Sequence, residues 1–169
     1  MADETQAARE AGVPLSRLIA SAAEREMRRR IGLAAVAEWE AEHGVYDAGA
    51  LIALDGDDRR MWARHKLALD EGRDIHVPAI VVGQAWRDGR RQVQLARALA
   101  GCLADAVGPE TSKAAGVLCG RSGTADVVDA TVVVMAAALR AIIWTSDAND
   151  VRSLARQSRM RPALVVRSV

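Results

Sequence analysis

The sequence predicts an α/β fold in which a parallel sheet of about five strands is covered by helices on both faces and preceded by a small all-helical segment. Two observations predict it. From about residue 44 onward, short apolar stretches alternate with longer amphipathic ones, the pattern of strands joined by crossover helices. The chain has 169 residues, 50% of them hydrophobic, which is enough for one such domain and a small appendage.

The beginning of the chain has the pattern of helices only. Gly12 is suited to closing a first helix, and apolar residues at helical spacing follow over residues 15–27. A third helical stretch, residues 33–44, carries Trp39 among glutamates. Helices this short are marginal alone, so we expect this segment to pack on a partner copy or on the rest of the chain, with Trp39 against the sheet domain.

Charge supports a boundary near Gly44. Residues 1–44 hold six Lys/Arg against eight Asp/Glu, whereas residues 45–169 hold 17 against 14. The net charge therefore changes from −2 to +3 across this point. We predict two units, a helical segment over 1–44 and a sheet domain over 45–169.

Strands and helices then follow in alternation. Strands are predicted at 44–47, 74–78, 103–108, 141–145 and 163–167. Helices are predicted at 48–54, 57–73, 82–89, 90–101, 109–120, 124–140 and 147–158. Pro78 ends the second strand, and Pro109 stands where proline favours the first turn of a helix.

Several polar residues are predicted to meet at one edge of this sheet. In a parallel sheet with right-handed crossovers, the carboxyl ends of the strands and the amino ends of the helices share one edge. Asp47 ends the first strand, and the spacing of Asp126 and Asp129 puts both on one face of a helix's first turn. The polar residues expected at this edge are Asp47, Gln84, Asp126, Asp129, Asp147 and Asp150.

Carboxylates gathered in this way favour a metal site. Like charges raise one another's pKa, so a dense cluster is unfavourable unless a cation neutralises it. Oxygen ligands without histidine suit Mg²⁺ or Mn²⁺, which can activate water and stabilise charge at a phosphorus under attack. The alternative is that Asp47, Asp126 and Asp147 merely cap helices, because aspartate is a preferred N-cap residue.

Four motifs resemble one known family. "YDAGALIAL", "VPAIVVGQAWR", "GTADVVDATVV" and "TSDANDV", in this order, resemble the VapC-type PIN-domain ribonuclease toxins of bacterial toxin–antitoxin pairs. The resemblance covers residues 45–169 and implies a PIN-like α/β/α sandwich, often a homodimer or higher homo-oligomer. It also implies a Mg²⁺- or Mn²⁺-dependent endoribonuclease acting on RNA. By position it makes Asp47, Asp129 and Asp147 the catalytic and metal-binding acids, with Asp126 and Asp150 as additional metal ligands.

One position departs from the family. A glutamate usually follows the second strand, and this chain has Gln84, whose amide has an oxygen but no negative charge. Two rival functions therefore stay open. One is a catalytically silent PIN-fold binding or assembly module. The other is a different carboxylate enzyme such as an aspartyl phosphotransferase, for which "YDAGAL" lacks the second acid of a DxD pair.

The first 44 residues resemble the cognate antitoxin. Residues 7–44 are similar to the two helices of a VapB-type ribbon-helix-helix dimeriser and the start of its toxin-binding arm. We therefore expect an antitoxin–toxin fusion protein whose dimer is held partly by residues 13–31, and a separate cognate antitoxin is a further candidate partner. The β-ribbon that would contact DNA is missing, so autonomous DNA binding is not expected.

RNA contacts are weakly indicated. The net charge of +1 gives no overall attraction to nucleic acid, so contacts need a local basic patch. Candidate phosphate contacts are Arg87, Arg90, Arg91, Arg97 and Arg121, each equally explained as a solvated helix face. Thr145 could orient a water or phosphate beside Asp147, while Trp86 and Trp144 are expected in the core or an interface.

Other residue types point to no further chemistry. Cys102 and Cys119 lack CxxC spacing and are expected as small buried hydrophobes. The three histidines show neither metal-ligand spacing nor a nucleophile partner and receive no role. No apolar run approaches the ~20 residues that span a bilayer, and the polar N-terminus has no signal-peptide core, so a cytoplasmic protein without a membrane partner is expected.

Overall fold

A computed structural model describes residues 43–159 and 163–169, all within one compact unit, Ala41–Val169. The predictions for residues 1–42, including the antitoxin-like helices and the position of Trp39, lie outside the described residues. The domain boundary predicted after residue 44 stays a prediction.

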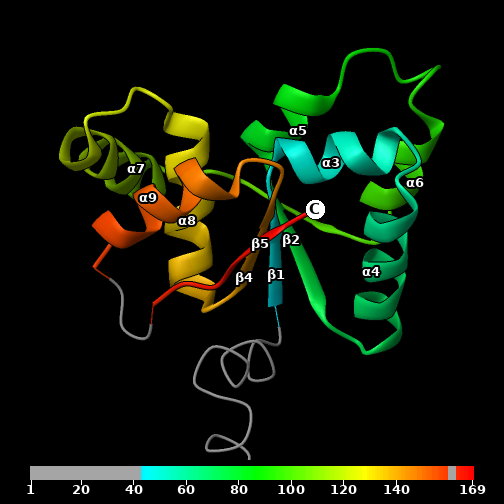
Figure 1. The fold of residues 1–169 in the computed structure, drawn as a ribbon. Coiled ribbons are helices and arrows are strands. Elements are labelled where there is room, and N and C mark those ends of the chain that lie inside the picture. The colour runs from blue at the N-terminus through cyan, green and yellow to red at the C-terminus, as the bar shows by residue number, and fades with distance from the viewer. Residues whose placement is uncertain (1–42, 160–162) are drawn as a thin grey trace, which may run out of the picture. The chain divides into compact units, whose positions relative to one another are not determined.

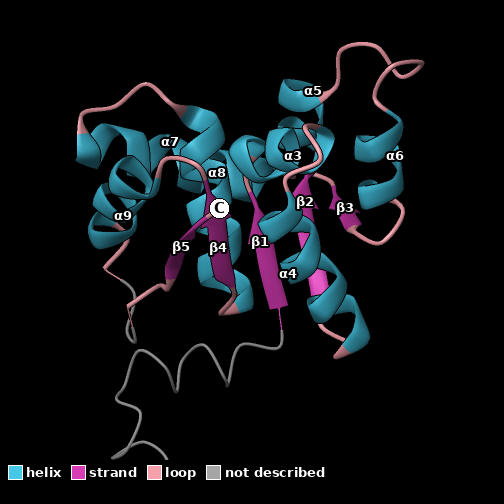
Figure 2. Ribbon diagram, turned by 45° about the vertical axis from the view of Figure 1, so that its right-hand side comes forward, coloured by secondary structure: helices cyan, strands magenta, loops and turns pink. Residues whose placement is uncertain are grey.

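Five strands form one parallel sheet, which confirms the predicted fold class (Figure 1 and Figure 2). They are β1 (His43–Tyr46), β2 (Asp74–Pro78), β3 (Leu103–Asp105), β4 (Ile142–Thr145) and β5 (Val166–Ser168). Their order is β3-β2-β1-β4-β5, and every neighbouring pair is parallel. The chain therefore moves outward from β1 to β3 and returns to lay β4 on the other side of β1. The carboxyl ends of β1 and β4 form the topological switch point, where open α/β sheets bind ligands.

Helices cover the sheet in two groups. The first group is α3 (Ala48–Asp55), α4 (Arg59–Asp70), α5 (Ala79–Ala85) and α6 (Val93–Leu99). The second is α7 (Pro109–Ser122), α8 (Val127–Leu139) and α9 (Ala148–Gln157). Contacts join α3 to α4, α5 and α6, and join α7, α8 and α9 to one another. Figure 1 shows the two groups on opposite sides of the strands.

The core lies between these layers and explains the strands and the central helix. The strand residues Val45, Val77 and Ile143 are fully buried, with 0% exposure. Helix α8 carries Val132 and Val133, also fully buried. Valine lowers helix propensity because its branched Cβ restricts rotamers, and burial of this apolar face offsets that cost.

Several predicted boundaries were wrong for local reasons. The helix predicted at 82–89 is α5, which begins directly after Pro78 and ends at Ala85, because Trp86 has an extended backbone (φ −74°, ψ 125°). Helix α8 begins at Val127 rather than at residue 124, because Asp126 caps it. The last strand occupies residues 166–168 instead of 163–167.

The sequence also predicts two buried cysteines and no membrane-spanning stretch. Cys102 and Cys119 are free and only partly buried, and burial raises the pKa of the Cys102 thiol to about 12. Within residues 43–159 and 163–169 no single helix has the length and hydropathy to cross a membrane, and α7 with α8 reaches them only as a pair bent by 113°.

Candidate functional site

Asp47 is the buried acid at the switch point. It directly follows β1, is 6% exposed, and its backbone N–H donates to the Trp144 carbonyl over 3.1 Å. Its Oδ1 accepts the backbone N–H of Ala50 at 2.8 Å, so Asp47 caps α3. Burial raises the pKa of Asp47, against the lowering effect of hydrogen bonds from the Thr145 side chain and from backbone N–H groups.

Thr145 joins Asp47 to Asp147. The Thr145 side chain is hydrogen-bonded to the Asp47 carboxylate, and its Oγ1 accepts the backbone N–H of Asp147 at 2.9 Å. Thr145 is fully buried, so its hydroxyl is fixed between the two acids. The role predicted for it, orienting a water or phosphate, stays a prediction. The structure gives it a second one, holding the end of β4 in register with the end of β1.

A glycine allows these two strand ends to approach. A Cβ on Gly49 would lie 2.0 Å from Ser146 Oγ and 2.8 Å from the Ser146 backbone nitrogen. The first turn of α3 therefore touches the segment that follows β4. The "YDAGAL" stretch needs glycine at this place for packing, independently of any chemistry.

Asp147 and Asp126 also cap helices. Asp147 Oδ1 accepts the N–H of Asp150 at 3.3 Å at the start of α9. Asp126 Oδ1 accepts the N–H groups of Val128 and Asp129, each at 3.0 Å. Asp126 thus precedes α8 as its N-cap and does not lie in its first turn, which corrects the sequence prediction. Asp47, Asp126 and Asp147 therefore all cap helices, as the alternative expected, and their role as metal ligands stays a prediction.

Asp129 is the acid that capping does not explain. It lies in the first turn of α8, partly buried, and its side chain makes no hydrogen bond within the described residues. Burial is the largest cause that raises the pKa of Asp129 to about 6. The further causes are repulsion by the carboxylates of Asp126, Asp47, Asp147 and Asp150. The other four acids predicted at this edge therefore all act on Asp129, and we call these five residues the acidic cluster.

The acidic cluster has the donor chemistry that a hard cation requires. Its groups are all carboxylates, and a cation would remove the repulsion that raises the pKa of Asp129. The capping bonds of Asp47, Asp126 and Asp147 are made by Oδ1 in each residue. The residues present fit Mg²⁺ or Mn²⁺.

A tighter group of possible metal ligands lies elsewhere. In the described part of the chain, one set of three such side chains has its ligand atoms all within 4.8 Å of one another, namely His43, Asp74 and His76. It sits at the amino ends of β1 and β2, whereas the acidic cluster sits at the carboxyl ends of β1 and β4. The sequence assigns these histidines no role, because a gap of 33 positions between His43 and His76 has no ligand-spacing signal. Strand register brings them together.

Gln84 is exposed on α5. The carboxylates that act on Asp129 come from the ends of β1 and β4 and from the first turns of α8 and α9. The α5 position contributes no charge to this set, as the sequence indicated.

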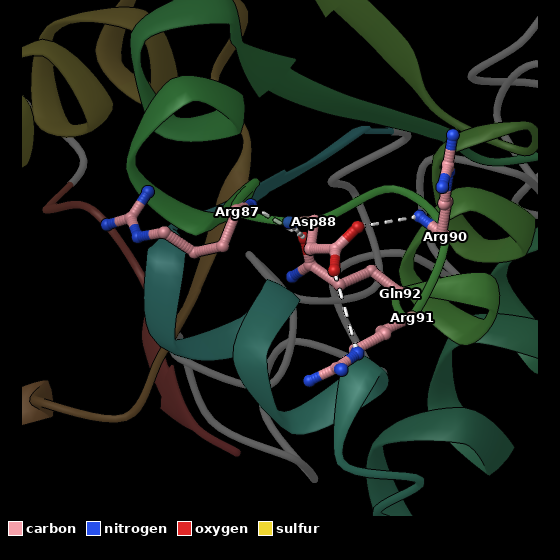
Figure 3. A network of polar contacts seen from close by, with 5 residues as sticks. All are labelled: Arg87, Asp88, Arg90, Arg91 and Gln92. Atoms are coloured by element: carbon pink, nitrogen blue, oxygen red, sulfur yellow. Dashed lines mark hydrogen bonds and ion pairs between the residues drawn. The ribbon is translucent and has the colours of Figure 1, made fainter.

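Three of the predicted RNA-contacting arginines, Arg87, Arg90 and Arg91, lie in the segment between α5 and α6 (Figure 3). Arg87 Nη1 donates to the carbonyls of Gly83 (3.1 Å) and Trp86 (2.9 Å). Arg91 Nε is 3.6 Å from Asp88 Oδ2, with an 89% exposed side chain. The Arg90 backbone N–H donates to Asp88 Oδ1 over 3.1 Å. All three are exposed, so the structure leaves them accessible to a phosphate.

Gln92 organises this arginine segment. Its Oε1 accepts the backbone N–H groups of Arg87 (2.6 Å) and Asp88 (2.9 Å), drawn in Figure 3. Its Nε2 donates to Asp55 Oδ2 (2.9 Å) and to the Ala85 carbonyl (3.0 Å). One side chain therefore ties the segment to the ends of α3 and α5. No sequence pattern predicts this role of Gln92.

The two tryptophans and the two remaining arginines lie in different surroundings. Trp86 is 39% exposed and is not a core residue, whereas Trp144 packs against the core. Arg97 lies 5.3 Å from the centre of the Trp62 ring, a cation–π contact that occupies its guanidinium. Arg121 is in the last turn of α7, where a cation is favoured by the helix dipole.

These observations define a class of fold, an α/β protein with a parallel sheet and carboxylates at its switch point. No protein-family model matches the sequence, and no curated protein matches it. Among solved structures, the chain is similar to one in the crystal structure of VapBC2 from Rickettsia felis bound to a DNA fragment from their promoter. The TM-score is 0.55 at 15% identity, over 75% of this chain and 98% of that chain. This likeness supports the fold.

Proposed function

We propose that the chain is a metal-dependent endoribonuclease that uses Mg²⁺ or Mn²⁺. The observation that carries the proposal is the environment of Asp129, whose pKa is raised to about 6 by burial and by four further carboxylates at the switch point. Asp47, Asp129 and Asp147 hold the cation, with Asp126 and Asp150 as supporting ligands. The bound cation supplies a water of lowered pKa and stabilises charge on the phosphate under attack.

The chain's own residues prepare this site. The Thr145 hydroxyl bonds the Asp47 carboxylate and the backbone N–H of Asp147, so that the two residues keep one geometry when substrate arrives. Among residues 43–159 and 163–169 the Asp129 side chain has no competing hydrogen bond, so it can turn toward a cation. On the substrate side, Arg87, Arg90 and Arg91 extend from a segment held by Gln92, and their exposed guanidinium groups would meet RNA phosphates.

We further propose a toxin–antitoxin setting. Two independent features support it, namely the order of the four motifs and the fold shared with a chain of VapBC2. In this proposal residues 1–44 are an antitoxin-like fusion, residues 45–169 are the toxin, and residues 13–31 help to hold a homodimer. A separate cognate antitoxin is a candidate partner. Removal of residues 1–31 should then lower the mass in solution by more than the residues removed, toward that of a monomer, and a truncated chain that stays dimeric would contradict the dimer proposal.

The test of the enzyme is cleavage of a labelled mixed RNA pool by the purified full chain with Mn²⁺ or Mg²⁺, against EDTA. Asp129→Asn should reduce cleavage at least about a hundredfold, because it removes the central carboxylate. Asp70→Asn, an exposed acid at the end of α4, is the matched control and should cleave like the unchanged chain. Cleavage that survives both EDTA and Asp129→Asn would overturn the proposal.

Gln84 favours a second candidate function, a catalytically silent binding or assembly module. It stands where the resemblance predicts a glutamate, so the site has one negative charge fewer. In this alternative the acids act only as helix caps. Absence of cleavage by the unchanged chain, together with no Mn²⁺ binding, would favour the module over the enzyme.

A further inference from the structure

The amino edge of the sheet carries a second group of chemically active side chains. His43 begins β1 and Asp74 begins β2, and the parallel register pairs these two residues. His76 lies two positions after Asp74, so it projects from the same face of the sheet. The ligand atoms of all three residues lie within 4.8 Å of one another.

His76 is held in the orientation of a metal ligand. Its Nδ1 is 2.8 Å from Asp105 Oδ2 on β3, which fixes Nδ1 as the protonated nitrogen when the ring is neutral. The other ring nitrogen, Nε2, then carries a lone pair. It is buried and has no hydrogen-bond partner in the described part of the chain, and His76 as a whole is only 8% exposed. A histidine that donates one nitrogen to a carboxylate and directs the other to a metal is the usual arrangement around zinc.

His43 supplies a second buried nitrogen without a hydrogen bond. Its Nδ1 is buried and lies 3.4 Å from Asp74 Oδ2, at ion-pair distance but without hydrogen-bond geometry. Leaving two polar nitrogens buried and unpaired at one place is unfavourable. Two ligand atoms about 2.0–2.1 Å from a tetrahedral zinc ion lie roughly 3.4 Å apart. The distance between His43 Nδ1 and Asp74 Oδ2 is 3.4 Å, so these two atoms have that separation.

We propose that His43, Asp74 and His76 bind a transition-metal ion of the zinc class. His43 Nδ1, the Asp74 carboxylate and His76 Nε2 are the ligands, and Asp105 orients His76. Two imidazoles and one carboxylate suit Zn²⁺ and leave a fourth position for water or another ligand. Asp74 is the accessible member, with a 55% exposed side chain, so the ion can enter from solvent on its side.

This site is separate from the acidic cluster. His43 and Asp47 stand at opposite ends of β1, four positions and therefore about 13 Å apart along the strand. The donor types also differ, with imidazole nitrogens at one end and only carboxylates at the other. The inference does not depend on the proposed ribonuclease activity. The bound ion would join the first residues of β1 and β2, where the sheet domain begins.

The competing explanation is a simple cross-strand pair of His43 with Asp74, with water on His76. Such a pair would bind no ion. The two explanations differ in whether Zn²⁺ binds the chain with one ion per molecule and whether binding needs Asp74 and His76 together.

The experiment is titration of the untagged full chain, first stripped of metals with EDTA, with Zn²⁺ by calorimetry and with Co²⁺ by visible absorption. With excess Mg²⁺ present to occupy the acidic cluster, we expect one tightly bound ion per chain with a Kd of about 1 µM or tighter, and the Co²⁺ spectrum of a tetrahedral site. Asp74→Asn and His76→Gln should each weaken binding at least about tenfold. Asp70→Asn, with the same charge change on exposed α4, and Asp129→Asn in the acidic cluster should both leave Zn²⁺ binding unchanged.

The outcomes separate clearly. Binding weaker than about 10 µM, or binding that Asp74→Asn leaves unaltered, would overturn the proposal. Loss of binding in Asp129→Asn would do the same, because it would move the ion to the acidic cluster. If His76→Gln does not fold, as judged by circular dichroism, Asp74→Asn decides alone, because Asp74 is exposed and its loss leaves the core intact.

Discussion

The two ends of strand β1 gather charged and polar side chains by different means. At the carboxyl end, Asp47 and its partners stand at the starts of helices, and helix capping fixes their backbones. At the amino end, His43 meets Asp74 because neighbouring strands are in register. The carboxyl end therefore depends on how α3, α8 and α9 begin, whereas the amino end depends on the sheet alone.

The two ends of β1 should therefore respond to different substitutions. Packing changes at the first turn of a helix should disturb the acidic cluster and leave the histidine group in place. Changes of side-chain chemistry on β1 and β2 should do the reverse. Zn²⁺ binding measures the state of the amino end, and Mn²⁺ binding measures that of the acidic cluster.

The largest effect is expected from Gly49→Ala. The new methyl would lie 2.8 Å from the Ser146 backbone nitrogen, so the start of α3 and the segment after β4 must separate. We expect a loss of about 2–3 kcal/mol in the free energy of unfolding, measured by urea denaturation, with weaker Mn²⁺ binding and unchanged Zn²⁺ binding.

Gly116→Ala is the matched control for that change. Gly116 lies inside α7, and a Cβ there would meet nothing within 4 Å. Alanine should therefore stabilise the chain by about 0.5–1 kcal/mol through helix propensity. Equal effects of the two substitutions would contradict the close contact between α3 and Ser146.

The arginine segment provides the next test. Gln92→Ala removes four hydrogen bonds that tie the backbone at Arg87 and Asp88 to Asp55 and Ala85. We expect a loss of about 1–2 kcal/mol and several-fold faster tryptic cleavage after the exposed arginines of this segment. Gln94→Ala is the control, because Gln94 makes no side-chain hydrogen bond in the described ranges, and it should cleave at the rate of the unchanged chain.

A smaller effect with a defined pH dependence is expected at Asp129. Its pKa is raised from 3.8 to about 6 in the folded chain, so folding favours the protonated carboxyl. The cost of ionising it is absent below pH 3.8 and complete above pH 6, and stability is lost as pH rises through this window. Asp129→Asn should therefore stabilise the metal-free chain at pH 7.5 by about 1 kcal/mol, a value discounted for partial solvent exposure.

The same measurement at pH 3.5 should show no stabilisation by Asp129→Asn. Asp126→Ala is the contrasting variant, because Asp126 caps α8 with two backbone hydrogen bonds. It should destabilise the chain by about 1 kcal/mol at pH 7.5. A destabilising Asp129→Asn at pH 7.5 would contradict a pKa of Asp129 raised by burial and by the neighbouring carboxylates.

The sequence predicted the fold and the acidic cluster because both follow from order along the chain. Apolar strands that alternate with helices imply a parallel sheet, and acids that follow strands must meet at one edge. It could not predict that Asp126 precedes α8 as a cap, because a shift of one or two residues leaves the apolar pattern unchanged. Nor could it find the pairing of His43 with Asp74 or the bonds of Gln92, which arise only from register and loop geometry.

The smallest effect is expected from Gln84→Glu, which restores a carboxylate on α5. An added negative charge near the carboxyl ends of the strands should tighten Mn²⁺ binding a few-fold, because partly exposed charges interact weakly in water. Gln157→Glu makes the same change at the far end of α9 and should leave Mn²⁺ binding unaltered. Neither should alter Zn²⁺ binding at the amino end. Equal Mn²⁺ affinities in the two variants, measured by calorimetry at low salt, would mean that position 84 lies outside the electrostatic reach of the acidic cluster. The silent-module alternative would then lose its main support, because a glutamine that does not act on the site cannot be what weakens it.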